Sequence, residues 1–248
     1  MKIKMFSLLF VTAVATTFAQ EVSLKEREKQ AAFDPAYNTY SRKKTAYVTL
    51  KDGTKLEGLV AGLDRKKGQI RGIEFKLEGE KKKKEIAASE IADLYMAPAG
   101  LDKLQKQNDF FNDATKWGKS DASQYISKGY TLYTNQTISL KNKKDEMELL
   151  MQVVNPRYNQ VIEVFSDPFA KETASFGVGS MKLAGGIAKS YYVKKGDQVI
   201  WLTKANFDDY WEMLFMDNDK FKEKYGDGKY KWSLLGVYIL DYTEFTLE

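Results

Sequence analysis

The sequence contains no histidine and no cysteine among its 248 residues. Histidine is the usual general base for a serine or cysteine nucleophile, and both residue types are common ligands of zinc and iron. Their absence excludes Ser-His-Asp and Cys-His catalysis, His/Cys zinc sites, histidine-ligated non-haem iron and iron–sulfur clusters. Carboxylate chemistry, lysine chemistry and calcium binding by oxygen ligands remain. We therefore expect no cofactor and no bound transition metal.

The sequence also lacks an apolar run long enough to cross a bilayer as a helix, which takes about 20 residues. A shorter apolar run at residues 5–15 follows two lysines and precedes the small residues of Thr17-Phe18-Ala19. This pattern predicts a secretory signal peptide over residues 1–19, cleaved after Ala19. No cysteine follows it, so the attachment point of a bacterial lipoprotein anchor is missing. We expect a soluble mature protein, periplasmic or secreted, with no transmembrane segment.

Neither sign of charge dominates the chain, since 39 Lys and Arg stand against 34 Asp and Glu, a net charge of +5. So small an excess does not require nucleic acid as a partner. Without disulfides, the stability of an exported chain must come from buried apolar area, which a content of 43% hydrophobic residues can supply. We expect an envelope protein or a glycan as the partner.

The spacing of apolar residues predicts an α+β protein built in successive segments. Residues 20–43 form a polar lead-in arm with one short helix. Residues 44–98 carry short alternating strands and a tight turn at Asp52-Gly53, which predicts an antiparallel, barrel-like module of SH3 or Sm size. Residues 99–126 are predicted to be a helical connector, and residues 127–248 a second, α+β domain.

The second domain is predicted to be an antiparallel sheet with the C-terminal helices packed on it. Strands at residues 147–153 and 161–165 are predicted to pair across an Asn-Pro turn, and residues 190–193 to pair with 199–202. The chain then changes to helical spacing. Five large side chains fall on one helical stripe: Phe207, Tyr210, Trp211, Leu214 and Phe215. We expect this stripe to be core, closing over one face of the sheet.

Several short strings carry a resemblance to a known group of proteins. They lie at residues 50–58 (LKDGTKLEG), 149–156 (LLMQVVNP), 167–173 (DPFAKET), 191–196 (YYVKKG) and 214–217 (LFMD), after a leader that ends in Phe-Ala-Gln. In these strings the chain resembles exported Bacteroidetes-type proteins of unknown function. The resemblance implies an envelope or secreted location, and it supplies no activity, ligand or catalytic residue.

The first candidate binding feature is a run of four lysines between two glutamates: Lys81, Lys82, Lys83 and Lys84. One interpretation is a site for an anionic partner, such as lipopolysaccharide phosphate, acidic glycan or nucleic acid. The other is a solvated hairpin whose lysines discourage pairing between sheet edges. The flanking acids and the lack of interleaved aromatic residues favour the second interpretation.

The second candidate is an aromatic hairpin formed by Tyr191, Tyr192 and Trp201. These rings are suited to a platform for a sugar or a peptide. They are equally suited to pinning a helix onto a sheet, because each ring buries a large apolar area. The second role is the commoner one for such residues and is favoured here.

Two further features do not match a known site. The glycines of residues 177–186 have the spacing of neither a P-loop nor a dinucleotide fingerprint, which favours a plain connection. The acid pairs Asp208/Asp209 and Asp217/Asp219 suit helix N-termini. We therefore predict an exported, non-catalytic binding or accessory protein of a bacterial envelope. The alternative is a carboxylate-dependent hydrolase acting on glycan or cell-wall material, which needs two acids that converge in a cleft.

Overall fold

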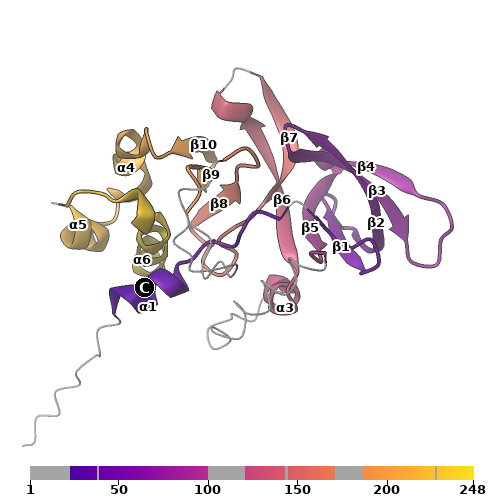
Figure 1. Ribbon diagram of the computed structural model, residues 1–248, viewed down its shortest axis with the longest axis horizontal. Helices are drawn as coiled ribbons and strands as arrows, with labels where there is room; N and C mark the ends of the chain where they lie inside the picture. The colour runs from indigo at the N-terminus through magenta and orange to yellow at the C-terminus, as the bar shows by residue number, and fades with distance from the viewer. Residues whose placement is uncertain (1–22, 38, 100–120, 143–144, 171–186, 227) are drawn as a thin grey trace, which may run out of the picture.

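The computed structural model describes residues 23–37, 39–99, 121–142, 145–170, 187–226 and 228–248. The predicted signal peptide, residues 100–120 of the predicted helical connector and the glycine-rich residues 177–186 lie outside the described residues. The described part is an α+β protein in three layers: a ring of strands, a three-stranded sheet and a group of helices (Figure 1).

The first layer is a seven-stranded antiparallel sheet. Its strands are β1 (Ala46–Leu50), β2 (Lys55–Lys66), β3 (Gln69–Leu77), β4 (Lys84–Ala87), β5 (Ile91–Met96), β6 (Thr131–Ser139) and β7 (Glu146–Gln152), with η1 (Ala88–Glu90) between β4 and β5. The strand order is β2-β1-β5-β6-β7-β3-β4, and an additional pairing of β2 with β3 closes six strands into a ring. Apolar side chains from every strand of the ring fill its interior. The predicted antiparallel, curled N-terminal sheet is confirmed.

The ring closes because β2 bends and pairs with both β1 and β3. A register shift between Val60 and Gly62 marks one point of bending. At Gly58 a Cβ atom would lie only 2.2 Å from the carbonyl oxygen of Lys76, so this close approach of two strands requires glycine.

The ring also includes β6 and β7, although residues 127–248 are predicted from the sequence to form a second domain. β6 pairs with β5 and β7 pairs with β6, while a single pair, Ile70 with Leu150, joins β7 to β3. Tyr133 and Leu150 then complete the apolar interior of the ring. The predicted connector at residues 99–126 therefore does not separate two independent sheets.

The turn at Asn155-Pro156 does not form the predicted hairpin. The strand before it, β7, pairs with β6, and the strand after it, β8 (Ile162–Ser166), pairs with β9 (Ser190–Lys195), so only one isolated bridge joins the two sides of the turn. The buried side chain of Asn155 holds the turn: it donates to the carbonyl oxygen of Ile162 and accepts from the N–H of Val164, each over 2.8 Å. The chain thereby leaves the ring and begins a second sheet.

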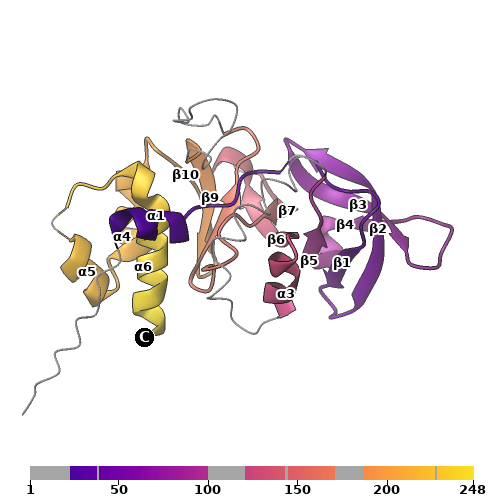
Figure 2. The same cartoon turned by 60° about the horizontal axis from the view of Figure 1, so that its bottom comes forward.

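The second layer is the sheet β10-β9-β8, and the predicted hairpin of β9 with β10 (Gln198–Thr203) is confirmed. Its residues alternate between two apolar cores. Phe165 and Tyr192 pack toward the ring, whereas Val164 and Val193 pack toward the helices. The sheet therefore lies between the other two layers (Figure 2). The short helix α3 (Asp121–Ser127) adds Ile126 to the core on the ring side.

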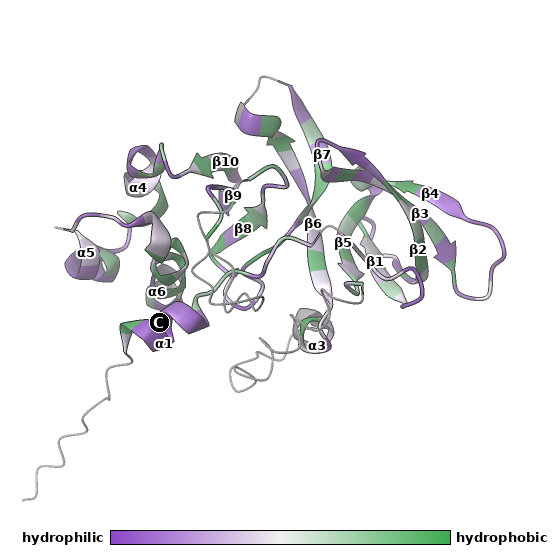
Figure 3. Ribbon diagram, in the orientation of Figure 1, coloured by the Kyte–Doolittle hydropathy of each residue, from purple (hydrophilic) through white to green (hydrophobic). Residues whose placement is uncertain are grey.

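The third layer consists of α4 (Phe207–Phe215), α5 (Asp219–Tyr225), η3 (Trp232–Leu234) and α6 (Leu235–Leu247). The predicted aromatic stripe is core: Phe207, Trp211, Leu214 and Phe215 are buried and Tyr210 is half-buried. α6 is predominantly apolar, whereas polar residues dominate α1 and α5 (Figure 3). None of the helices in the described part of the chain combines the length and the apolar character needed to cross a bilayer.

The predicted lead-in arm forms hydrogen bonds along all three layers. Its helix, α1 (Leu24–Gln30), contacts α6 through the Arg27 side chain, which donates to Asp241 over 2.6 Å. Farther along, the N–H of Asp34 donates to Val154 beside the second sheet, and the N–H of Ser41 donates to Ala97 at the end of β5. This N-terminal segment runs from the helices to the ring (Figure 2) and ties the layers together.

Candidate functional site

The lysine run lies where a solvated hairpin was predicted. Lys81, Lys82 and Lys83 are exposed in the connection between β3 and β4, and Lys84 is exposed at the start of β4. Lys83 forms an ion pair with Glu74 over 3.0 Å. Exposed pairs of this kind contribute little to stability. None of the four lysines lines the pocket described below.

The aromatic hairpin is not a flat platform, because its two tyrosines point to opposite faces of β9. Tyr191 is buried in the core with the helices, and Tyr192 is buried in the core with the ring. Trp201 is half-buried, and its indole N–H donates to the carboxylate of Asp167 over 2.9 Å. The favoured interpretation of these rings as packing residues agrees with their burial.

The acid pairs proposed from the sequence remain separate surface features. Asp208 and Asp209 are exposed in the first turn of α4. Asp217 accepts from Lys195 and from the Tyr242 hydroxyl. Burial alone raises the pKa of Asp217, but those hydrogen bonds and the Lys195 charge lower it to a net value below the ordinary one. Asp219 is exposed at the start of α5, which the neighbouring Asn218 side chain caps.

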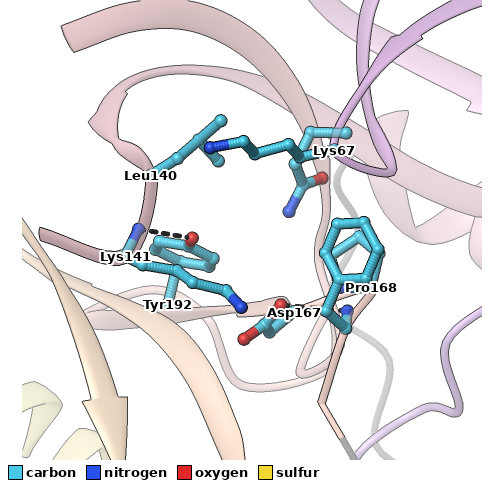
Figure 4. Close-up of a pocket in the computed structure, with 8 residues that line it drawn as sticks. Lys67, Leu140, Lys141, Asp167, Pro168 and Tyr192 are labelled. Carbon is cyan, nitrogen blue, oxygen red and sulfur yellow. Dashed lines mark hydrogen bonds between the residues drawn. The ribbon is translucent and has the colours of Figure 1, made fainter. Parts of the chain in front are cut away.

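A pocket opens where three turns meet between the ring and the three-stranded sheet (Figure 4). The turns are the β2–β3 hairpin, η2 (Leu140–Asn142) after β6, and residues 167–170 after β8. Its lining includes Lys67, Leu140, Lys141, Asp167, Phe169 and Tyr192. We call this the seam site. It is small, with room for about one water molecule.

Two lysines give the seam site its charge. Neither Lys67 nor Lys141 forms an ion pair with any residue that the structure describes, and both are exposed. The Lys141 ammonium group lies 5.5 Å from the Phe169 ring centroid and 5.9 Å from that of Trp201, within cation–π range. In Figure 4 the Lys67 side chain extends toward Leu140, while that of Lys141 extends toward Asp167.

Both lysines occupy an unusual backbone conformation. Among the described residues they are the two non-glycine residues with positive φ, 47° at Lys67 and 55° at Lys141. Such conformations are disfavoured for residues with a side chain and cluster at functional sites. The N–H of Lys141 donates to the Tyr192 hydroxyl over 3.1 Å, which holds this turn. Burial raises the pKa of Tyr192 to about 12, so the phenol stays neutral.

Asp167 anchors the other side of the seam site. Its carboxylate is buried and accepts from the Ser190 hydroxyl over 2.7 Å, the Trp201 indole over 2.9 Å and the Phe169 N–H over 3.0 Å. The acid is therefore fully engaged within the fold. With two ammonium groups that form no ion pair among the described residues against one hydrogen-bonded carboxylate, the site is suited to an anion.

A second polar cluster lies between the layers. Asp93 on β5 and Glu163 on β8 are the two carboxyl groups with raised pKa values among the described residues. Burial raises the pKa of Asp93. Burial also raises the pKa of Glu163. Lys194 lowers this pKa, and the negative charge of Asp93 raises it. Lys194 and Glu163 form an ion pair over 3.5 Å. No group of three or more potential metal-ligating side chains occurs in the described ranges.

Two of the candidate residues predicted from the sequence lie at the seam site, although the site itself was not predicted. Tyr192 lines it and Trp201 holds its acid. Lys67, Lys141 and Phe169 were missed as a group, because they are separated by up to 102 positions and meet only through the fold. The signals present in the sequence were a basic turn at residues 65–67 and an Asp-Pro turn at residue 167.

No protein-family model, curated protein or solved structure matches this chain.

Proposed function

We propose that this chain is a non-catalytic binding or accessory protein, exported to the envelope or exterior of a bacterium, that holds an anionic ligand at the seam site. One observation carries the proposal: two lysines that form no ion pair with the described residues line the same pocket as the exposed Phe169 ring. Binding sites are commonly formed by loops that a rigid scaffold holds in place, and here the ring and the sheet supply that scaffold.

The test of binding is calorimetric titration of inorganic tripolyphosphate into the full protein at low ionic strength. Two lysines about 4 Å from the anion contribute about 1 kcal/mol each in water, so Lys67→Gln/Lys141→Gln is expected to weaken binding about 30-fold. The matched control is Lys81→Gln/Lys82→Gln, which removes the same charge from the exposed run and should leave the affinity within about 2-fold. Equal losses in the two variants would contradict the proposal.

Export has its own test. If residues 1–19 are a cleaved signal peptide, N-terminal sequencing of the protein from the periplasm or medium of a bacterial host should begin at Gln20. Retention of Met1 in the membrane fraction would contradict this part of the proposal.

A carboxylate-dependent hydrolase is the second candidate, and the cluster of Asp93 and Glu163 favours it. Raised pKa values are typical of carboxyl groups that act as general acids. For this candidate, hydrolysis of a cell-wall glycan should disappear in both Asp93→Asn and Glu163→Gln and persist in Asp208→Asn. The absence of hydrolysis by the unmodified protein, together with anion binding at the seam site, would decide for the binding protein.

A further inference from the structure

The charged groups at the mouth of the seam site set the first requirement on a ligand. Ammonium groups donate hydrogen bonds and cannot accept them. The only acid of the described lining, Asp167, already accepts from three donors of the fold. A ligand must therefore bring its own acceptors. A carboxylate or phosphate makes the strongest such bonds with lysine.

The exposed ring sets the second requirement. The Phe169 side chain is 57% exposed, one of three large apolar side chains of the described residues that stand in solvent. Its backbone is nevertheless fixed, because its N–H donates to Asp167 and the preceding Pro168 packs against Gly68 so closely that a Cβ there would lie 2.4 Å away. A preorganised apolar surface loses little entropy when a ligand covers it. The ligand therefore needs a flat apolar face next to its acid group.

The shape of the site sets the third requirement. Peptides are commonly recognised through pockets for their side chains or by addition to a strand edge. The lining of the seam site comes mainly from three turns, and the pocket has room for only about one water molecule. A pyranose ring needs neither feature, because its C–H groups lie on a flat face and its polar substituents surround the rim.

We infer that the seam site binds an anionic saccharide, whose sugar ring covers Phe169 while its carboxylate or phosphate bonds with Lys67 and Lys141. This inference rests on the proposed function and adds the class of ligand to it. Two sources supply the same chemistry, a uronate polymer and a phosphorylated sugar headgroup. Both place an acid within three bonds of a pyranose ring.

The experiment compares five probes by calorimetry with the full protein: trigalacturonate, its neutral methyl ester, glucosamine 6-phosphate, tripolyphosphate and a hexaglutamate peptide. The anionic sugars are expected to bind and the ester to bind at least ten times more weakly. Phe169→Ala should weaken the anionic sugars about 3- to 10-fold, the range for loss of one aromatic contact, and leave tripolyphosphate unchanged. Lys141→Gln should weaken both kinds of anion. The tighter of the two anionic sugars identifies the source.

Leu247→Ala is the matched control, because Leu247 is also exposed, at 63%, on the far helical layer. It should change no affinity. Binding of tripolyphosphate with no dependence of any sugar on Phe169 would overturn the inference and leave the proposed function standing. A hexaglutamate peptide that binds as tightly, with the same dependence on Phe169, would assign the site to acidic peptides instead. Failure of every anion would reject both proposals.

Discussion

Truncating Trp211 to alanine tests how the helical layer is held on the sheet. The Trp211 side chain is only 3% exposed and stands among five aromatic rings. Its ring centroid lies 3.4 Å from that of Tyr230 in a stacked arrangement, 4.8 Å from Phe215 and 5.0 Å from Tyr238. Phe207 and Phe221 complete the group. Loss of this side chain therefore leaves a cavity at the centre of the third layer.

Removal of a buried tryptophan costs about 3–5 kcal/mol of unfolding free energy. For a chain of this size each kcal/mol corresponds to about 2–4 °C, so Trp211→Ala should lower the melting temperature by about 6–20 °C. Calorimetric melting measures this directly. The exposed neighbour Glu212 supplies the control, since Glu212→Ala should change stability by less than about 0.5 kcal/mol.

A second variant separates packing from hydrogen bonding at this position. The buried indole N–H of Trp211 has no hydrogen-bond partner among the described residues, so Trp211→Phe removes an unsatisfied donor while keeping an aromatic ring. It should destabilise clearly less than the alanine variant. A melting temperature of Trp211→Ala equal to that of the unmodified protein would refute the assignment of this stripe to the core.

Three further predictions concern charge. Replacing the lysines of residues 81–84 with glutamine should change the unfolding free energy by less than about 0.5 kcal/mol in urea melts, because they are exposed. Asp93→Asn should raise the melting temperature at pH 7. Burial raises the pKa of Asp93 in the folded protein, so the charged carboxylate destabilises the native state as the pH rises. The increase in melting temperature should therefore vanish in acid, where Asp93 is protonated. Asp241→Asn should lower the unfolding free energy by about 3 kcal/mol, because this fully buried carboxylate accepts from Arg27 and from Lys224. Glu244→Gln, which removes the more exposed acid paired with Arg27, should lower it by less than about 1 kcal/mol.

Local signals predicted the local parts of this fold. The Asp52-Gly53 turn, the alternation that forms β3 and the helical stripe of α4 each depend on neighbours within a few residues. Closure of the ring depends instead on distant residues, since β6 and β7 come from beyond residue 130 to pair with β5 and β3. The side chain of Asn155 likewise decides between a hairpin and a change of sheet through buried hydrogen bonds that spacing does not show.

The seam site was beyond prediction for the same reason. Lys67, Lys141 and Phe169 lie in three turns from distant parts of the chain, and each alone resembles an ordinary surface residue. Their relation depends on the packing of Pro168 against Gly68 and on the carboxylate of Asp167, which hold two of these turns. The more conspicuous lysine run, in contrast, is visible in the sequence and solvated in the structure.

The central claim is that an anion binds at the seam site, and nuclear magnetic resonance of protein labelled with ¹⁵N-lysine tests it most directly. The backbone amide signals of Lys67 and Lys141 belong to the two turns that would contact the anion. Titration with tripolyphosphate should move both signals along one saturable curve while those of Lys81 and Lys82 stay in place. Shifts confined to Lys81 and Lys82, or no saturable shift at all, would contradict the account.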